Sequence, residues 1–437
     1  MHILFLTQII PYPPDAGPKV KTWHVLRYLA SRGHRVTLAS FVRQEEEEHV
    51  SALKDVCQEV YTVSIRRSRL EDAGYWVRSH FTGRPFLIER DDLREIRNVV
   101  EKLLKTQTID VIHADQLTMT QFALPKDSHD VFGGMNNNHV LERQNQVDKP
   151  FLIFDAHNAV WTILERMSDN VPWYMRLLVT IEARKVKKYE GEIVTEFDHT
   201  FAVTEIDRTS LLSAADSVSN ENLSRDKVVS VVPIAVDTNE IKPVQLIDTS
   251  HFILTLGSLQ YPPNADGIRW FFQEVFPIVK ENIPEAQLTI IGKNPPHDFI
   301  RFADKNSEFV TVTGYVPDLE PYLQQAAVLA IPVRAGGGMR VRILEALAYG
   351  EAVVTTTIGL EGIDAKPGKE VLVADSPQDF AGAVIRLLED FELRKELSRN
   401  GRRLVERSYD WRGVFKNIDD IYQGIELANQ RDNAFDE

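Results

Sequence analysis

Residues 334–350 read RAGGGMRVRILEALAYG, and they follow an apolar run at residues 327–333 that predicts a buried strand. Three glycines, beginning at Gly336, open the helix that this stretch predicts. Gly350 ends it, because glycine accepts the left-handed conformation found after many helices. A strand, a glycine loop and a helix N-terminus favour anion binding, since backbone N–H groups point outward and the helix dipole attracts negative charge. The stretch therefore predicts a strand–helix unit of an α/β fold with an anion site.

The predicted helix carries charge only at Arg340, Arg342 and Glu345, and its apolar residues on nearly every side predict burial. Cations in a first helical turn lie at the unfavourable end of the helix dipole, so we interpret the two arginines as ligands of an anion. Glu345 needs a partner, because a buried carboxylate is costly alone. The alternative is that Arg342 and Glu345 pair three residues apart in an ordinary strand–helix unit.

Length and composition predict a soluble globular protein with two domains. The chain has 437 residues, of which 43% are hydrophobic and 26% charged. Its single cysteine, Cys57, allows no internal disulfide, which indicates a reducing, cytoplasmic setting. No apolar run reaches the roughly 20 residues of a membrane span, and the N-terminal segment is interpreted as a strand rather than a signal peptide.

The formal net charge of −14 argues against general nucleic-acid binding. An anionic ligand would therefore need a local basic pocket, which Arg334, Arg340 and Arg342 could form. The sequence shows no Asp-x-Asp dyad placed for a metal and no His/Cys spacing of a zinc site. We therefore expect no metal and no resident cofactor.

Strand and helix patterns alternate over residues 1–232, and the alternation restarts after an irregular linker at 233–242. This order predicts two parallel sheets with right-handed crossovers, that is, two Rossmann-like doubly wound α/β domains facing each other across a cleft. The expected boundaries are 1–232, 233–408, and a final helix with a polar tail at 409–437. Within the first half we expect a polar exposed loop at 133–150 and a long helix at 172–196, broken or bent near Gly191.

Several motifs resemble those of the GT-B glycosyltransferases of family 4. They are LGSL at 256–259 with PNADGIRWF at 263–271, GYVPD at 314–318, GGGMRVRILEA at 336–346, GHRV at 33–36 after the first strand and its glycine loop, and VPIAVD at 232–237. The resemblance covers nearly the whole chain and is nearest to the bacterial sugar transferases of exopolysaccharide gene clusters. It implies a nucleotide-sugar-dependent, retaining enzyme whose C-terminal helix crosses back to the N-terminal, acceptor-binding domain.

In that family a Glu-x7-Glu motif touches the donor. Its second glutamate matches Glu345, which implies contact with the ribose hydroxyls, whereas the first would fall at Gly337 and is absent. The Lys/Arg pair usual in the donor-phosphate loop is also missing, and Ser258 stands where an arginine is common. These departures assign the diphosphate to Arg340 and Arg342, which could supply the missing positive charge.

The resemblance implies further contacts, each with a plainer alternative. His157 would reach the donor sugar, or be a capping or core histidine; His113 is a weaker candidate. Gly17 would lie near the donor phosphate and acceptor, or in an ordinary strand–helix turn. Lys293 would border the nucleotide, or be a solvated lysine. The remaining donor-binding residues are expected to be Tyr315 and Val316 beside the base, and Gly336, Gly337, Gly338 and Met339 through close backbone approach.

The expected reaction is transfer of a sugar from a nucleoside-diphosphate donor of UDP or GDP type to a glycan or lipid-linked acceptor, with retention, in polysaccharide or glycoconjugate biosynthesis. Fixed cations and N–H dipoles would stabilise the leaving diphosphate, so we expect no metal requirement. A GT-B nucleotide-sugar epimerase and a non-catalytic nucleotide-sugar-binding subunit remain as alternatives.

Two segments of the N-terminal half favour contact with the inner face of a membrane. Residues 66–69 are basic, and the aromatic-apolar residues 173–178 lead to a basic run at 184–188. The alternative is a core-packed helix with one solvated face.

Overall fold

The computed structural model describes residues 1–124, 149–168, 171–219 and 229–435. The chain divides into two compact units. Unit 1 comprises Met1–Pro233 and Phe415–Glu437, and unit 2 comprises Ile234–Val414. The polar loop expected at 133–150 lies, except for its last two residues, outside the described residues.

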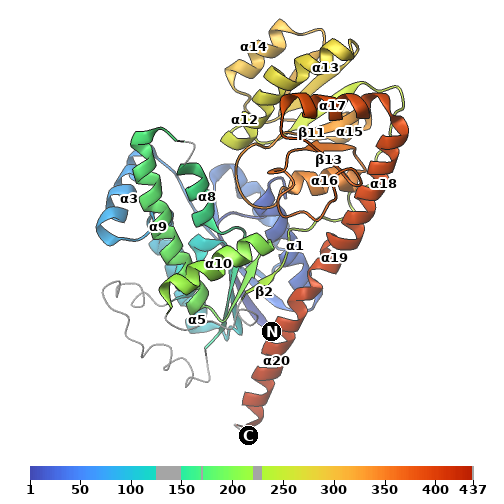
Figure 1. Cartoon of the computed structure of the whole chain (residues 1–437). Coiled ribbons are helices and arrows are strands. Elements are labelled where there is room, and N and C mark those ends of the chain that lie inside the picture. Colours follow the sequence, from blue (N-terminus) through green and yellow to red (C-terminus); the bar gives the residue numbers. More distant parts are fainter. Residues whose placement is uncertain (125–148, 169–170, 220–228, 436–437) are drawn as a thin grey trace. The chain divides into compact units, whose positions relative to one another are not determined.

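Unit 1 is built on a seven-stranded parallel sheet with the order β3-β2-β1-β4-β5-β6-β7. Its strands are coloured from blue to green in Figure 1. The strands are β1 (His2–Thr7), β2 (Arg35–Val42), β3 (Glu59–Ser64), β4 (Val111–Asp115), β5 (Phe151–Ala156), β6 (His199–Ala202) and β7 (Val229–Val231). Strands β1, β2, β4, β5 and β6 are almost wholly buried, as expected for a sheet covered on both faces, whereas the edge strands β3 and β7 are only partly buried. The order reverses between β1 and β4, which makes the carboxyl ends of these strands a topological switch point.

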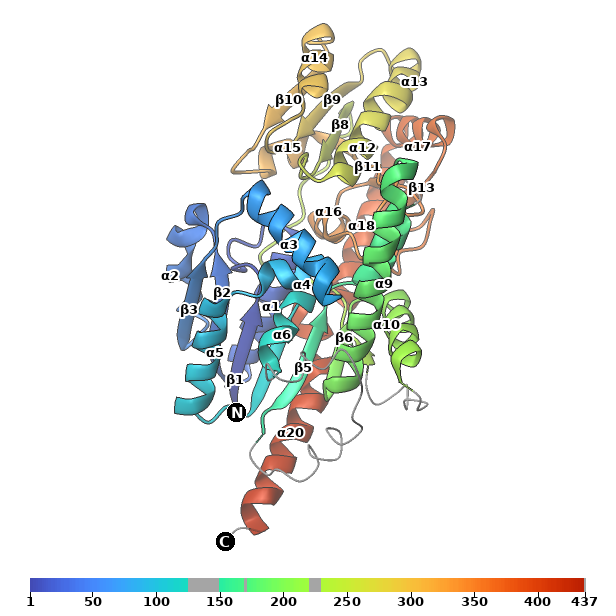
Figure 2. The same ribbon diagram turned by 90° about the vertical axis from the view of Figure 1, so that its left-hand side faces the viewer.

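Helices lie in front of and behind this sheet (Figure 2). They are α1 (Gly17–Ser31), α2 (Val50–Leu53), α3 (Arg69–Thr82), α4 (Phe86–Asp91), α5 (Arg94–Thr106), α6 (Thr120–Ala123), α8 (Val160–Ser168), α9 (Trp173–Glu196), α10 (Glu205–Val218) and α20 (Lys416–Phe435), with 3₁₀ turns η1 (Gln44–His49) and η2 (Leu117–Met119). Helices α3 and α4 have no counterpart among the elements expected from the sequence. The ends of α3 nevertheless follow local rules: Ser68 Oγ accepts a hydrogen bond from Glu71 N at 3.2 Å, and Gly83 ends the helix at φ 72°.

The expected break of the long helix near Gly191 is wrong, because α9 runs through it without interruption. The glycine has a packing role instead. A Cβ placed there would come within 2.3 Å of the carbonyl oxygen of Ala214, on α10. Gly191 thus lets α9 and α10 approach closely. A glycine within a helical sequence pattern does not by itself show whether it serves close packing or a bend.

Unit 2 has a six-stranded parallel sheet of order β10-β9-β8-β11-β12-β13, the same winding as in unit 1. Its strands are β8 (Phe252–Leu256), β9 (Gln287–Ile291), β10 (Val310–Gly314), β11 (Ala326–Ile331), β12 (Val353–Thr355) and β13 (Leu372–Val373). Its helices are α12 (Pro262–Trp270), a π-helical turn η4 (Phe271–Val275), α13 (Phe276–Asn282), α14 (His297–Lys305), α15 (Glu320–Gln325), α16 (Val341–Tyr349), α17 (Pro377–Glu389), α18 (Phe391–Ser408) and α19 (Trp411–Val414). The second switch point falls between β8 and β11.

The last helix, α20, belongs to unit 1 although it follows unit 2 in the chain. Tyr422 Oη lies 2.8 Å from His113 Nδ1 in β4, and Arg32 Nη2 lies 3.1 Å from Asp419 Oδ2. The predicted fold class, two doubly wound α/β units with a returning C-terminal helix, is therefore confirmed. Within the described residues, no helix combines the length and the hydropathy needed to cross a bilayer.

Candidate functional site

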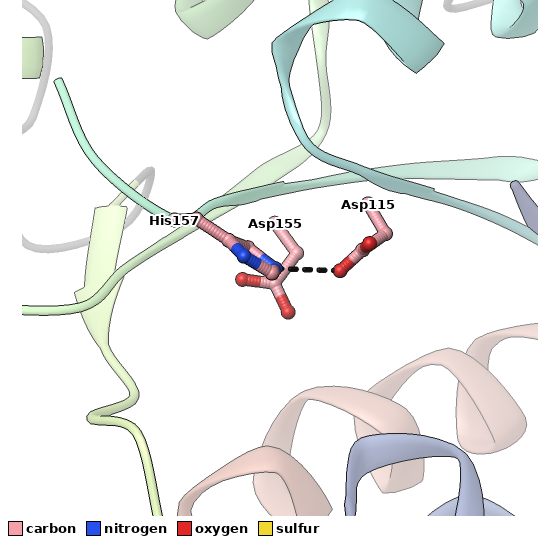
Figure 3. A group of neighbouring side chains, drawn as sticks. All are labelled: Asp115, Asp155 and His157. Carbon is pink, nitrogen blue, oxygen red and sulfur yellow. Dashed lines mark hydrogen bonds and ion pairs between the residues drawn. The ribbon is translucent and has the colours of Figure 1, made fainter. Parts of the chain in front are cut away.

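Three ionisable side chains meet at the carboxyl edge of the unit 1 sheet, beside its switch point (Figure 3). Asp115 is the last residue of β4, Asp155 lies near the end of β5, and His157 follows β5. All three are buried. Since ligands of doubly wound sheets bind outside the carboxyl ends of the strands at such a point, this cluster is the first part of the candidate site.

The imidazole of His157 is oriented by Asp115. The two atoms His157 Nε2 and Asp115 Oδ1 are 2.7 Å apart. The other carboxylate oxygen of Asp115 accepts hydrogen bonds from Thr7 Oγ1 at 2.8 Å and Thr22 Oγ1 at 3.0 Å. The second ring nitrogen, Nδ1, has no hydrogen-bond partner among the described residues. A histidine held at one nitrogen can present the other to a ligand.

Asp155 is buried beside one lysine and two histidines. Lys21 Nζ contacts its Oδ1, and His113 Nε2 lies 3.4 Å from its Oδ2. Burial alone would raise the pKa of Asp155, but the Lys21 ammonium and the two neighbouring histidines lower it below its ordinary value. Asp155 is therefore ionised at neutral pH, and its charge is compensated by Lys21.

The chain segment that carries His157 is held by two further buried carboxyl groups. Asp207 Oδ1 accepts from Ala159 N at 3.0 Å, and Glu190 accepts from Val160 N at 2.8 Å and from Trp161 N at 3.0 Å. These contacts satisfy N–H groups at the start of α8, which an isolated helix leaves unpaired. The backbone just after His157 is therefore held in place by hydrogen bonds, as the support of a ligand-binding side chain requires.

The cluster also has the composition of a small cation site. Ligand atoms of Asp115, Asp155 and His157 all lie within 4.8 Å of one another. The Lys21 ammonium, however, already contacts Asp155 and provides positive charge there. A divalent ion would have to compete with this lysine, so the cluster is better suited to orienting His157 than to holding a metal.

Unit 2 places the predicted glycine loop at the carboxyl end of β11, at its own switch point. Gly336 and Gly338 have φ of 111° and 77°, which other residues rarely adopt, and Gly350 ends α16 at φ 76° as expected. The helix begins at Val341, so the glycines and Met339, whose side chain is buried, precede it. Arg340 occupies the N-cap position.

Both arginines of this loop contact protein oxygens. Arg340 Nη1 donates to the carbonyl oxygens of Gly337, at 2.5 Å, and Gly338, at 3.1 Å, so its side chain braces the loop. Arg342 Nη1 donates to Glu345 Oε2 at 2.8 Å. This is the ion pair that the sequence offered as the alternative to anion binding; contact of either arginine with a diphosphate stays a prediction.

The remaining donor-binding candidates lie along the same edge of the unit 2 sheet. Ser258, Lys293 and Tyr315 follow β8, β9 and β10, and all three are exposed; Val316 is half-buried. The loops are packed closely: Gly292 N donates to Gly314 O at 3.0 Å, and a Cβ on Gly292 would come within 2.4 Å of Gly257 O. In unit 1, Gly17 is the first residue of α1, the helix that carries Lys21.

Most of the residues that surround His157 in unit 1 were not expected from the sequence. They are Lys21, Asp115, Asp155, Glu190 and Tyr422. A usable signal existed for two of them, because Asp115 and Asp155 are carboxylates at the predicted ends of consecutive strands, where the switch-point rule places ligands. Lys21 and Tyr422 lie on helices and gave no such signal.

Comparison with known proteins agrees with this geometry. Residues 250–390 match the family model described as "Glycosyl transferases group 1". An uncharacterised 44.6 kDa protein of the cps region of Klebsiella pneumoniae is 22% identical over 428 residues, which cover 95% of this chain and 98% of that one.

Solved structures align along nearly the full length. Sucrose-phosphate synthase from Thermosynechococcus elongatus gives a TM-score of 0.66 at 16% identity, covering 98% of this chain and 100% of the other. HepE of Anabaena, solved with UDP and glucose, gives a TM-score of 0.63 at 12% identity. The alignment covers 97% of this chain and 100% of HepE.

The chain therefore has the GT-B fold of two Rossmann-like units. Residues 250–390, in unit 2, are similar to the group 1 glycosyl transferases.

Proposed function

We propose that this protein is a retaining glycosyltransferase that moves a sugar from a nucleoside-diphosphate donor to a glycan or lipid-linked acceptor, in polysaccharide or glycoconjugate biosynthesis. The observation that carries the proposal is the oriented, buried imidazole of His157 at the switch point of unit 1. It occurs in a chain whose unit 2 matches a glycosyltransferase family. The setting of the Klebsiella relative in a cps region is consistent with a polysaccharide product.

Unit 2 is proposed to bind the nucleotide at the carboxyl ends of β8 to β11. N–H groups of the loop at Gly336–Gly338 and of the first turn of α16 would face the diphosphate, with Arg340 and Arg342 beside it. A carboxylate accepts several hydrogen bonds, so Glu345 can hold Arg342 and a ribose hydroxyl together. UDP is the first nucleoside diphosphate to test, because HepE was solved with UDP.

In the proposed reaction the bond between the anomeric carbon and the diphosphate oxygen breaks, and a bond to the acceptor oxygen forms on the same face. The acceptor hydroxyl proton passes to the departing phosphate, so no protein nucleophile is required. N–H dipoles and arginines stabilise the charge that develops on the diphosphate, without a metal. His157 would hydrogen bond a hydroxyl of the transferred sugar through Nδ1.

The test begins with a thermal-shift comparison of UDP, GDP, ADP and dTDP, since a ligand that binds only the folded chain raises its melting temperature. The matching nucleotide sugar is then incubated with candidate acceptors in the presence of EDTA, and nucleoside diphosphate release and product anomer are measured. Acceptor-dependent release with a retained anomer supports the proposal. Conversion of free donor without acceptor would show an epimerase, and binding without turnover a non-catalytic subunit.

A further inference from the structure

Helix α3 of unit 1 turns its large apolar side chains toward solvent. Leu70, Val77 and Phe81 recur at helical spacing on one side, with exposures of 87%, 49% and 88%, and the neighbouring Trp76 is 42% exposed. Ser79 is the buried residue of this helix. A surface helix normally buries its apolar stripe against the core, so α3 is inverted.

The first two turns of α9 show the same inversion. Trp173, Tyr174 and Leu177 are 86%, 62% and 68% exposed, and Met175 and Leu178 are each 43% exposed. Further along, Ala183 and Val186 are buried, so only the beginning of the helix leaves the core. Nine of the 18 large apolar side chains exposed in the described chain thus lie in α3 and these two turns.

Helices α3 and α9 contact each other within unit 1, at residues of α9 that follow its first two turns. Lys185 Nζ of α9 donates to Ser79 Oγ of α3 at 2.6 Å, and Phe86 N, just beyond α3, donates to Glu182 Oε1 of α9 at 2.5 Å. We call the nine exposed apolar side chains of α3 and α9 the apolar surface. They are Leu70, Trp76, Val77, Phe81, Trp173, Tyr174, Met175, Leu177 and Leu178.

Charge around the apolar surface is opposite in sign to that of the whole chain. Residues 66–84 and 173–188 contain ten Lys and Arg against three Asp and Glu, in a chain of net charge −14. Arg67, Arg78 and Arg84 pair with the buried carboxylates Asp91 and Glu89.

Other cations remain available to a partner. Arg66, Arg69 and Arg184 are exposed and form no ion pair in the described structure. Arg66 lies just before α3, Arg69 is its first residue and Arg184 lies on α9, and these two helices carry exposed tryptophan and tyrosine. Basic and interfacial aromatic residues together favour the headgroup region of an anionic bilayer.

We propose that the apolar surface docks unit 1 onto an anionic phospholipid membrane. Leu and Phe side chains enter the upper acyl region, the Trp and Tyr side chains lie at headgroup depth, and Arg66, Arg69 and Arg184 contact lipid phosphates. The protein lies on the membrane through helices packed on a folded unit, as interfacial amphipathic helices do. The proposal is independent of the proposed function, since binding to vesicles requires no donor, acceptor or turnover.

The test is co-sedimentation of the full chain with vesicles of phosphatidylcholine alone, or of phosphatidylcholine and phosphatidylglycerol in equal parts. Wild-type protein is expected to pellet with the anionic vesicles at least tenfold more than with the neutral ones, and less as salt is added, because salt screens the arginines. The double variants Leu70→Ser/Phe81→Ser and Trp173→Ser/Leu177→Ser should each lower anionic binding at least tenfold. Arg66→Gln/Arg69→Gln/Arg184→Gln should abolish the preference for phosphatidylglycerol.

Ile300→Ser is the matched control, since Ile300 is 41% exposed on α14 of unit 2, outside the apolar surface. All changed side chains are exposed, so the variants should keep the wild-type melting temperature. Vesicle binding unchanged in the double variants, or absent in the wild type, would overturn the proposal. A wild-type dimer in size-exclusion chromatography that the same variants dissolve would also overturn it, in favour of a second copy of the chain.

Discussion

His113 Nδ1 and Tyr422 Oη are 2.8 Å apart in the interior of unit 1, although 309 positions separate the two residues in the chain. His113 also stacks on Phe5, with 4.4 Å between ring centroids, and its Nε2 faces Asp155. Burial, with the charge of Asp155, raises the pKa of Tyr422 well above its ordinary value, so the phenol stays protonated. The returning helix α20 is thus joined to the buried cluster that orients His157.

Tyr422→Phe is expected to destabilise unit 1 by about 1–3 kcal/mol, because it removes one buried hydrogen bond and leaves His113 Nδ1 without a partner. Urea denaturation followed by tryptophan fluorescence measures the change. Tyr315→Phe is the control, since Tyr315 is 68% exposed and its hydroxyl can remain solvated. Equal stability of Tyr422→Phe and wild type would show that the contact contributes nothing.

Asp115→Asn should lower turnover by about 10²-fold while the chain stays folded. The amide keeps the size of the side chain but loses the charged acceptor that Thr7, Thr22 and His157 share, and small misplacements of a reacting group carry costs of this order. Acceptor-dependent release of nucleoside diphosphate measures the effect, and nucleotide binding by unit 2 should be unchanged. A loss of nucleotide affinity equal to the loss of turnover would contradict a positioning role.

Local features of the site were predictable from sequence, and long-range ones were not. The loop at Gly336–Gly338 and the end of α16 at Gly350 follow from residues adjacent in the chain, so strand, glycine and helix rules identify them. The ion pair of Lys21 with Asp155 joins positions 134 residues apart. Hydrophobic periodicity assigns each to an element, but it does not say which element ends meet.

Helix α3, which was not among the expected elements, and the unbroken helix α9 show the same limit. Apolar residues at helical spacing predict a helix, yet the pattern is identical whether the stripe faces a core or the solvent. Near Gly191 the helix was expected to be broken or bent; α9 is unbroken there, and the glycine admits α10 at close distance. Both outcomes depend on what packs against the helix, which the local sequence does not contain.

Glu345→Ala separates the two interpretations of the Arg342–Glu345 pair. As a partly exposed ion pair it is worth about 0–1 kcal/mol, so its loss should barely change stability. If Glu345 also binds the ribose hydroxyls, nucleotide affinity should fall about 10- to 100-fold, as for lost hydrogen bonds to a charged group. Isothermal titration with the nucleoside diphosphate measures this; unchanged affinity would leave the ion pair as the whole role of Glu345.

Gly336→Ala should weaken nucleotide binding and destabilise unit 2 by about 1–3 kcal/mol. The φ of 111° disfavours any side chain, and a Cβ would lie 3.0 Å from Arg340 Nη2, against the side chain that braces the loop. Gly382→Ala is the matched control in helix α17, where a Cβ has no neighbour within 4 Å and alanine favours the helix. Melting temperature and nucleotide titration should change for the first variant, whereas the second should retain wild-type binding.

Glu190 should make unit 1 less stable as pH rises toward mild alkalinity. Burial raises the pKa of Glu190 from 4.5 to about 8. The hydrogen bonds from the N–H groups of Val160 and Trp161 lower the pKa, but burial has the larger effect. Between these values the unfolded chain has lost a proton that the folded chain keeps. The free energy of unfolding therefore falls by about 1.4 kcal/mol per pH unit, and levels off above the folded pKa.

Glu190→Gln cannot ionise, so its stability should decline less between about pH 5 and pH 8, although its amide nitrogen cannot accept one of the two N–H hydrogen bonds that Glu190 accepts. Thermal unfolding across this range measures the difference in slope. Glu205→Gln is the control, because Glu205 is exposed in the first turn of α10 and should leave the wild-type slope unchanged. Parallel pH profiles of Glu190→Gln and wild type would mean that Glu190 is already ionised in the folded chain. The start of α8, and with it the segment that carries His157, would then be capped by a carboxylate anion rather than by a neutral acid.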